Sequence, residues 1–151
     1  SPVRALEAMP VNLLTKEESE WSRVQNKSEN PVEPILLMNY IKDLEDWIIK
    51  LKKSKKLILV EGKKDRKSLK LFGIDKIMTI NKPLFEIVEI ISSKFKECII
   101  LTDLDPEGRK IYSYIRRNLE RNGVKVDNKY REFLFKNTKI RNIEGLRNYL
   151  K

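Results

Sequence analysis

Three carboxylates stand at alternate positions, Asp103, Asp105 and Glu107, directly after the short apolar segment Cys98–Leu101. Such an apolar segment is typical of a strand buried on both faces of a parallel sheet, and the proline and glycine that follow mark a turn. Carboxylates held close together repel one another, and Mg²⁺ is the cation whose preference for oxygen ligands suits them. We therefore expect a metal site here. The alternative is that Asp105 and Glu107 only cap the helix that follows.

A second acidic position follows another apolar segment, Leu57–Val60, which ends in Glu61 and Gly62. Gly62 permits a tight turn before a helical pattern in which Asp65 would be a first-turn acid. Ligands of open α/β sheets bind beyond the carboxyl ends of the strands. If both strands lie in one parallel sheet, Glu61 faces the acids after Cys98–Leu101.

Alternating helical and strand patterns surround these two positions. Apolar segments predict four strands, at 57–60, 77–80, 98–101 and 124–126. Helical spacing predicts helices at 34–53, 64–72, 84–95 and 109–122, with shorter ones at 128–136 and 143–150. Within 84–95, Phe85, Val88, Ile91 and Phe95 are expected to face inward. This order predicts an α/β fold with a small parallel sheet covered by helices on both faces.

Length and composition bound the class of protein. A chain of 151 residues allows one domain, here 34–151, preceded by 1–33, which we interpret as a polar tail or linker. The sequence opens with Ser1, which suggests a processed or trimmed terminus, and shows no signal-peptide pattern. The single Cys98 in an apolar strand suits a reducing compartment, so we expect a cytoplasmic protein. No apolar stretch is long enough for a membrane span, and the absence of His excludes histidine-based catalysis.

The net charge of +10 is unevenly placed. Residues 1–33 carry a net charge of −2, which leaves +12 on the rest of the chain. A basic domain around an acidic site indicates a polyanionic partner, although a solvated, lysine-rich surface is the alternative. The cations nearest the acids or on the following helix are our candidates for nucleic-acid binding: Lys63, Lys64, Arg109, Lys110, Arg116 and Arg117.

Taken together, LILVEGKKD and the later IILTDLDPEGRKI resemble the two signature motifs of the Toprim domain, over roughly Leu57 to Phe135. That resemblance implies a Rossmann-like sheet of about four strands. It is greatest to the small stand-alone archaeal Toprim proteins and looser to ribonuclease M5-like proteins. Topoisomerases usually carry a further acid where this chain has Arg109, so their metal arrangement is not expected here.

The resemblance also implies roles for the acids. Glu61, Asp103 and Asp105 match catalytic positions, and these three with Glu107 would bind Mg²⁺, or Mn²⁺ in its place. The implied function is a Mg²⁺-dependent nuclease or other phosphodiester-processing protein acting on structured RNA or DNA, with RNA favoured. Two alternatives stay open: a non-catalytic module that binds nucleic acid or the ribosome, and a primase-like nucleotidyl transferase. The second alternative is disfavoured because the chain offers no zinc-binding segment.

Overall fold

The structure is a computed structural model that describes residues 41–149, the last of them by its backbone alone. The predicted tail, 1–33, and the start of the predicted 34–53 helix lie outside the described residues. Leu44 begins a unit that contains every element discussed below. These elements are, in order, α4 (Leu44–Ser54), β1 (Leu57–Val60), α5 (Lys63–Lys70), β2 (Ile77–Thr79), α6 (Leu84–Lys94), β3 (Glu97–Leu101), α7 (Pro106–Arg121), β4 (Lys125–Val126), α8 (Lys129–Asn137), the 3₁₀ turn η2 (Ile143–Gly145) and α9 (Leu146–Tyr149).

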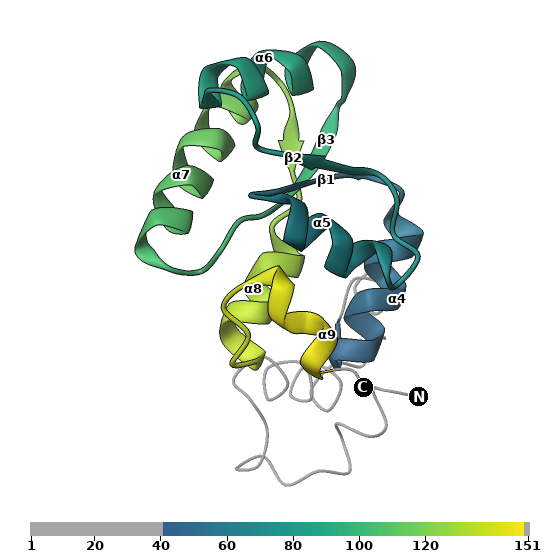
Figure 1. The fold of residues 1–151 in the computed structure, drawn as a ribbon. Coiled ribbons are helices and arrows are strands. Elements are labelled where there is room, and N and C mark those ends of the chain that lie inside the picture. The colour runs from purple at the N-terminus through teal and green to yellow at the C-terminus, as the bar shows by residue number, and fades with distance from the viewer. Residues whose placement is uncertain (1–40, 150–151) are drawn as a thin grey trace, which may run out of the picture. The chain divides into compact units, whose positions relative to one another are not determined.

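The four strands form one parallel sheet, as predicted, and their order is β2-β1-β3-β4 (Figure 1). β1 and β3 lie side by side at its centre, and Val60 pairs with Leu101 at their carboxyl ends. The two strands have nine residues. Eight of them are apolar and buried, and the exception is Glu97. Strands buried on both faces need helices on both sides, which explains the βα alternation of the sequence.

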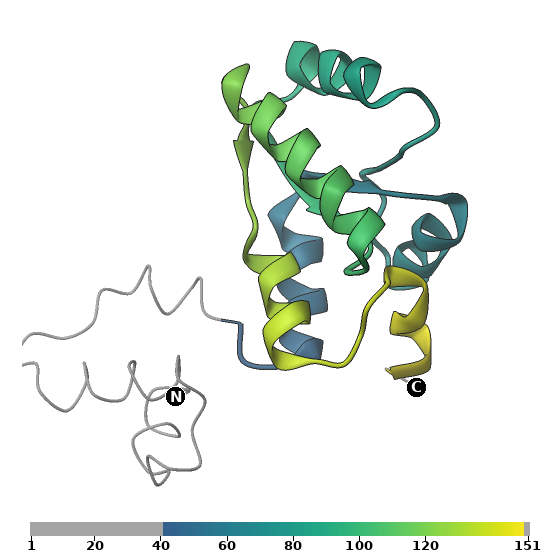
Figure 2. The ribbon, with the colours of Figure 1, turned by 90° about the vertical axis from the view of Figure 1, so that its left-hand side faces the viewer.

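Two helical layers cover the sheet. Helices α6 and α7 lie on one face, and α4, α5 and α8 lie on the other (Figures 1 and 2). On the first face, Leu57, Leu59 and Ile100 pack with Ile91 of α6 and Ile115 of α7. On the second, Trp47 of α4 is completely buried, and its Nε1 donates a 2.9 Å hydrogen bond to the carbonyl oxygen of Tyr130 in α8. The sheet is therefore held rigidly between two cores.

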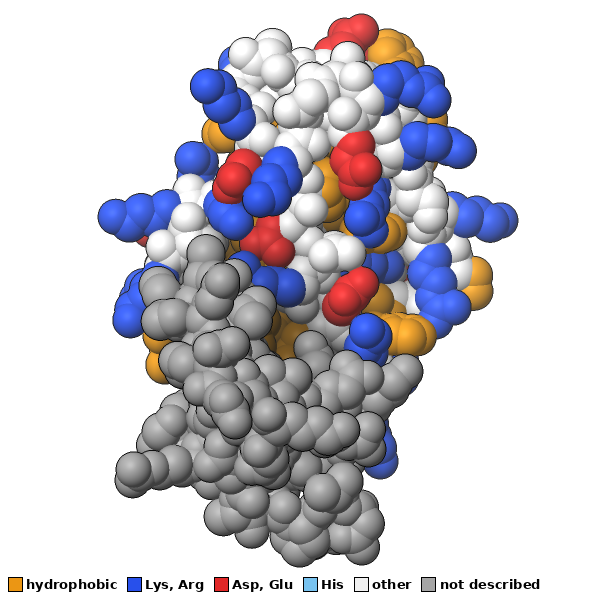
Figure 3. Space-filling view, turned by 180° about the vertical axis from the view of Figure 1, so that it is seen from behind, with side chains coloured by type: hydrophobic (Ala, Val, Ile, Leu, Met, Phe, Trp, Pro, Cys, Tyr) orange, Lys and Arg blue, Asp and Glu red, His pale blue; other side chains and the backbone are white. Residues whose placement is uncertain are grey.

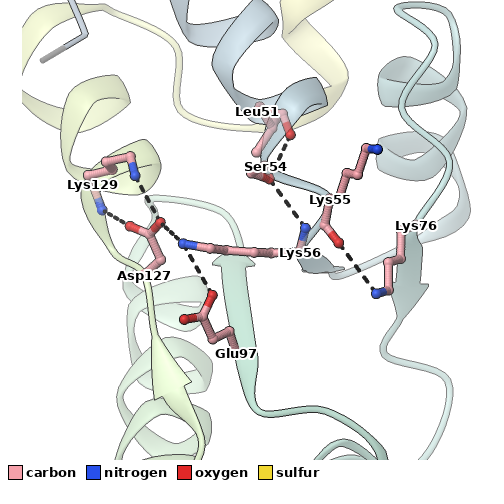
Figure 4. Close-up of polar contacts among 8 residues, drawn as sticks. All are labelled: Leu51, Ser54, Lys55, Lys56, Lys76, Glu97, Asp127 and Lys129. Carbon is pink, nitrogen blue, oxygen red and sulfur yellow. Dashed lines mark hydrogen bonds and ion pairs between the residues drawn. The ribbon is translucent and has the colours of Figure 1, made fainter. Parts of the chain in front are cut away.

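A network of charged side chains joins the elements at the amino ends of β1 and β3 (Figure 4). The ammonium of Lys56 lies 2.9 Å from a carboxylate oxygen of Asp127, just after β4, and 3.4 Å from one of Glu97. Lys129 reaches the same Asp127 oxygen at 3.1 Å. This network lies at the edge of the sheet opposite the turns after Val60 and Leu101, so it fixes the strands without entering the acidic site.

Two details of the sequence prediction are wrong. Residues 41–43 are not helical, and α4 begins at Leu44, because Asp43 and two acids in the first turn favour a helix start there. Phe85 is 56% exposed instead of facing inward. The buried positions of α6 follow the spacing Ile87, Val88 and Ile91, and Phe85 lies outside that stripe.

Candidate functional site

The carboxyl ends of β1 and β3 bring Glu61 and Asp103 together. Glu61 directly follows β1, and Asp103 follows β3 by two residues. A carboxylate oxygen of Glu61, Oε1, accepts a hydrogen bond of 3.0 Å from the backbone N–H of Asp103. The two acidic motifs, 42 residues apart in the chain, thus meet at one edge of the sheet, as the strand pattern predicts.

Asp105 and Glu107 lie at the start of α7 and are exposed. Asp105 is the N-cap residue, and its Oδ1 accepts a 2.7 Å hydrogen bond from the backbone N–H of Gly108. Glu107 is an acid of the first turn, after a proline at the first helical position. The capping interpretation therefore holds for Asp105. It leaves the metal-binding interpretation open, because a cap uses one carboxylate oxygen and a metal takes another.

Asp103 is the acid with an unsatisfied oxygen. Its Oδ1 is buried and has no hydrogen-bond partner. Burial, together with the neighbouring carboxylates of Glu61, Asp65 and Asp105, raises the pKa of Asp103 to about 6, against the opposing charge of Arg131. An ionised oxygen in this position is costly unless a cation or a proton satisfies it.

Glu61 and Asp65 share this crowded negative environment. Burial is the main cause that raises the pKa of Glu61, and the charges of Asp105, Asp65 and Glu107 add to it. Asp65 is buried in the first turn of α5, where its Oδ2 accepts a 3.0 Å hydrogen bond from the backbone N–H of Gly62. Burial also raises the pKa of Asp65. All three groups would gain from a positive charge placed between them.

The donor set suits Mg²⁺ in its chemistry. The oxygens are carboxylates, and one of them, Oδ1 of Asp103, has no other partner. Among residues 41–149, no three acidic, histidine or cysteine side chains are gathered closely enough to surround a metal together. Mg²⁺ commonly keeps several waters and binds through one or two carboxylates plus phosphate, so the set fits such a site. The four-residue ligand set of Glu61, Asp103, Asp105 and Glu107 stays a prediction.

Arg131 is the site residue that sequence reasoning missed. It lies on α8, is only 7% exposed, and points its guanidinium at the turn after β3. Its Nη1 donates to the carbonyl oxygen of Thr102 and, at 2.9 Å, to Oγ1 of the same residue, and its Nη2 donates to the carbonyl oxygen of Asp103 at 3.0 Å. The guanidinium also lies 4.4 Å from the ring centroid of Tyr112. A charged residue among the apolar residues YREFLF was the available signal.

The turn is closed from the other side by α7. Thr102 Oγ1 donates a 2.8 Å hydrogen bond to the carbonyl oxygen of Gly108. A Cβ on Gly108 would lie 2.0 Å from the carbonyl oxygen of Asp103, so only glycine permits this approach. Backbone contacts with Arg131, Thr102 and Gly108 therefore fix the position of Asp103 before any ligand arrives.

The candidate cations fall into two groups. Lys63, Lys64, Lys110 and Arg117 are exposed and do not line the groove between α7 and α8. The structure brings Arg109 and Arg116 together along a groove of about 400 Å³ between α7 and α8. Figure 3, from behind the view of Figure 1, shows many Lys and Arg side chains on that side of the molecule, with fewer Asp and Glu among them. None of these contacts tests nucleic-acid binding, which stays a prediction for all six cations.

Comparison with known proteins agrees with this fold. The Toprim domain matches residues 56–135, and the chain belongs to the Toprim family. It is 36% identical to a UPF0292 protein of Methanocaldococcus jannaschii, over 68% of this chain and 84% of the relative. It is 40% identical to a UPF0292 protein of Pyrococcus abyssi, over 73% of this chain and 85% of the relative. The resemblance to small archaeal Toprim proteins is thereby confirmed.

A solved structure supports the same assignment. A protein of Aquifex aeolicus has 36% sequence identity and a TM-score of 0.64, covering 68% of this chain and 97% of its own. Toprim domains generally bind Mg²⁺, and the family connects this chain with metal-dependent processing of nucleic acids in general terms. In the part of the chain that the structure describes, no helix combines the length and apolar character that crossing a membrane requires.

Proposed function

We propose that this protein is a Mg²⁺-dependent nuclease that hydrolyses phosphodiester bonds in structured nucleic acid. The observation that carries the proposal is the buried, unpartnered Oδ1 of Asp103 beside Glu61 at the carboxyl ends of the two central strands. An unsatisfied carboxylate among further carboxylates favours a cation, and a Toprim fold associates that cation with phosphate chemistry. Asp103 and Asp105 would hold Mg²⁺, and Glu107 would complete or tune the site.

When bound, Mg²⁺ would neutralise the charge that develops on the phosphoryl oxygens. Glu61 is the group to which we assign proton transfer. The Asp103 N–H fixes its carboxylate, and its pKa is raised by burial and by the acids around it, so it exchanges protons nearer neutral pH. In the proposed step, a water oxygen attacks phosphorus, Glu61 takes the water proton, and the bond to the leaving oxygen breaks. Glu61 acts only as the base in this step, and the leaving oxygen takes its proton from solvent.

RNA is the substrate we favour, with ribosomal RNA or the ribosome as its source, because the two motifs also resemble those of ribonuclease M5-like proteins. The cations of α5 and α7 would bind the phosphate backbone, so affinity should fall steeply as salt rises. We place the activity in the cytoplasm, since a lone buried cysteine suits a reducing compartment.

The test is cleavage of a panel of structured RNAs and DNAs in Mg²⁺ and in Mn²⁺. Glu61→Gln keeps the size of the side chain and removes its ionisable group, so it should abolish cleavage and leave binding nearly intact. Asp103→Asn should abolish cleavage and weaken Mn²⁺ binding. Glu89→Gln and Asp75→Asn are matched controls, because both acids are exposed and lie outside the site.

Cleavage by Glu61→Gln at the wild-type rate would contradict the assignment. Tight binding without cleavage by any variant would favour the non-catalytic binding module.

A further inference from the structure

The groove between α7 and α8 adjoins the turn that carries Asp103. Arg131 lines the groove and also holds the carbonyl oxygens of Thr102 and Asp103. Leu104, which lies in the same turn after β3, also lines the groove. The volume of about 400 Å³ falls within the roughly 300–1,000 Å³ of small-ligand sites. In Figure 2, α7 is the green helix and α8 the yellow-green helix. Its cationic and aromatic walls are Arg109, Tyr112 and Arg116 of α7, and Arg131, Phe135 and Lys136 of α8.

Phe135 is an exposed aromatic ring within this groove. Its side chain is 48% exposed, whereas its neighbours on α8, Phe133 and Leu134, are buried in the core. Two guanidinium groups lie against it: that of Arg109 is 5.3 Å from the ring centroid, and that of Arg141 is 5.9 Å away. An aromatic face flanked by planar cations is the combination on which unpaired bases stack in single-stranded nucleic-acid sites.

The charge of the groove favours an anion. Arg109 and Arg141 have no carboxylate within ion-pair distance among the residues that the structure describes. Arg116 differs, because its Nε lies 2.6 Å from an oxygen of Glu120. The one acid of the groove wall, Glu132, lies 3.8 Å from the ammonium of Lys136. Arg109 and Arg141 are therefore the cations with charge to offer a phosphate.

We propose that this groove binds an unpaired nucleotide of the nucleic acid, with its base stacked on Phe135 and its phosphate held by Arg109 and Arg141. The ligand class rests on the proposed function, but the binding does not depend on cleavage. An unpaired base in the groove would set the register of the strand, so that a neighbouring phosphodiester lies at Asp103. The preferred substrate would accordingly be a duplex with a bulge or loop beside the cleaved bond, not a continuous duplex.

The test uses two RNA hairpins of equal length and charge. One carries a single bulged 2-aminopurine, and in the other the same base is paired. Binding is measured with the full chain in EDTA, by anisotropy for affinity and by 2-aminopurine fluorescence for stacking. We expect the bulged hairpin to bind about tenfold more tightly, as stacking of one base allows, and its fluorescence to be quenched.

Variants assign the effect to the groove. Phe135→Ala should remove the preference for the bulge and the quenching, and Phe135→Trp should restore both. Phe85→Ala is the matched control, since Phe85 is also about half exposed but lies on α6. Arg109→Gln should weaken binding of both hairpins more than Arg117→Gln, a change at an exposed cation outside the groove. Thermal unfolding of each variant would identify any loss that comes from misfolding.

Equal affinity for the two hairpins, or equal effects of Phe135→Ala and Phe85→Ala, would overturn the proposal. So would binding of polyglutamate that competes with the bulged hairpin at equal concentration, because the groove would then recognise negative charge alone. Failure of the nuclease proposal is distinguishable, since it concerns cleavage in Mg²⁺ and these measurements are made without metal. A nuclease without bulge preference would overturn only the groove, and bulge binding without cleavage would overturn only the nuclease.

Discussion

The carbonyl oxygen of Asp103 lies 2.0 Å from the point that a Cβ on Gly108 would occupy. A separation below 3.0 Å between such atoms requires one of them to move, and here the neighbouring oxygen belongs to the backbone and not to a flexible side chain. The first turn of α7 and the turn after β3 are thus packed without space for any side chain. Gly108 matters for this close approach, and Gly62 has no comparable neighbour, since its nearest contact would be at 3.9 Å.

Gly108→Ala should therefore displace the turn that carries Asp103 and destabilise the protein by about 1–3 kcal/mol, the usual cost of overpacking. Gly62→Ala, at the matching position after β1, is the control and should cost less. Denaturant unfolding gives both free energies, and Mn²⁺-induced broadening of amide signals reports on the displaced site. Equal free energies of unfolding for the two variants would show that the turn yields easily.

Asp103 should make stability depend on pH. Its pKa is raised to about 6 in the folded protein, so the folded state binds a proton more tightly than the unfolded chain. The favourable contribution is complete below the unfolded pKa, near 4, and is lost as pH rises through about 6. Because solvent screens this half-buried group, we expect a loss of roughly 1 kcal/mol. Denaturant unfolding in EDTA from pH 4 to 7 should show a shallower decline for Asp103→Asn than for wild type, and parallel curves would contradict the shift.

Asp127 should have the opposite pH dependence. Burial alone would raise its pKa, but hydrogen bonds and charges from Lys56 and Lys129 lower it. Its contribution to stability is therefore complete above the unfolded pKa and lost as pH falls through the lower, folded pKa. Asp127→Asn should lower the free energy of unfolding by about 1 kcal/mol at pH 7. Lys56 and Lys129 would then lose the charge of a half-buried carboxylate (Figure 4). Glu132→Gln, in an exposed pair, is the control and should change the free energy of unfolding little.

The central strand provides a test of the core. Ile100 is 1% exposed and packs among residues of β1, α6 and α7. Ile100→Ala should destabilise by about 2–5 kcal/mol, since it removes buried methyl groups and leaves a cavity. Ile49→Ala removes the same atoms from an α4 position that is 50% exposed, so its cost should be much smaller. A denaturant midpoint unchanged by Ile100→Ala would contradict the position of β3 at the centre of the sheet.

Local patterns were sufficient to predict the sheet and the place of its acids. Continuous apolar segments identify β1 and β3, and parallel strands end at one edge, so Glu61 and Asp103 had to lie near each other. The glycines in the turns after α5 and α7 also follow from sequence, since Gly73 and Gly123 have φ values of 81° and 83°, although Leu71 and not Gly73 is the C-cap of α5.

Contacts between distant elements were not predictable in the same way. That Asp105 caps α7 while Asp103 keeps a buried, unpartnered oxygen depends on how the turn bends, which the spacing of the acids does not specify. Phe85 was misplaced because a helix stripe can be drawn through either of two neighbouring apolar residues until its packing partners are known. A charge among apolar residues was the one local signal for Arg131, but its position depends on where α8 crosses the sheet, which is a tertiary relationship.

Arg131→Lys should show what the guanidinium does for the acidic turn. Two nitrogens of Arg131 serve three acceptors on Thr102 and Asp103, and the plane of the group lies over Tyr112. A lysine offers one compact ammonium and no stacking plane, so at least one buried carbonyl would lose its partner, at a cost of about 1–3 kcal/mol. Arg121→Lys, at an exposed position in the last turn of α7, is the control and should be nearly neutral.

A positioning role also predicts that Mn²⁺-induced broadening of the 103–108 amides weakens in Arg131→Lys at temperatures where the variant is fully folded. Unaltered broadening with reduced stability would mean that Arg131 stabilises only the core, and that the turn holds Asp103 in place without help from Arg131.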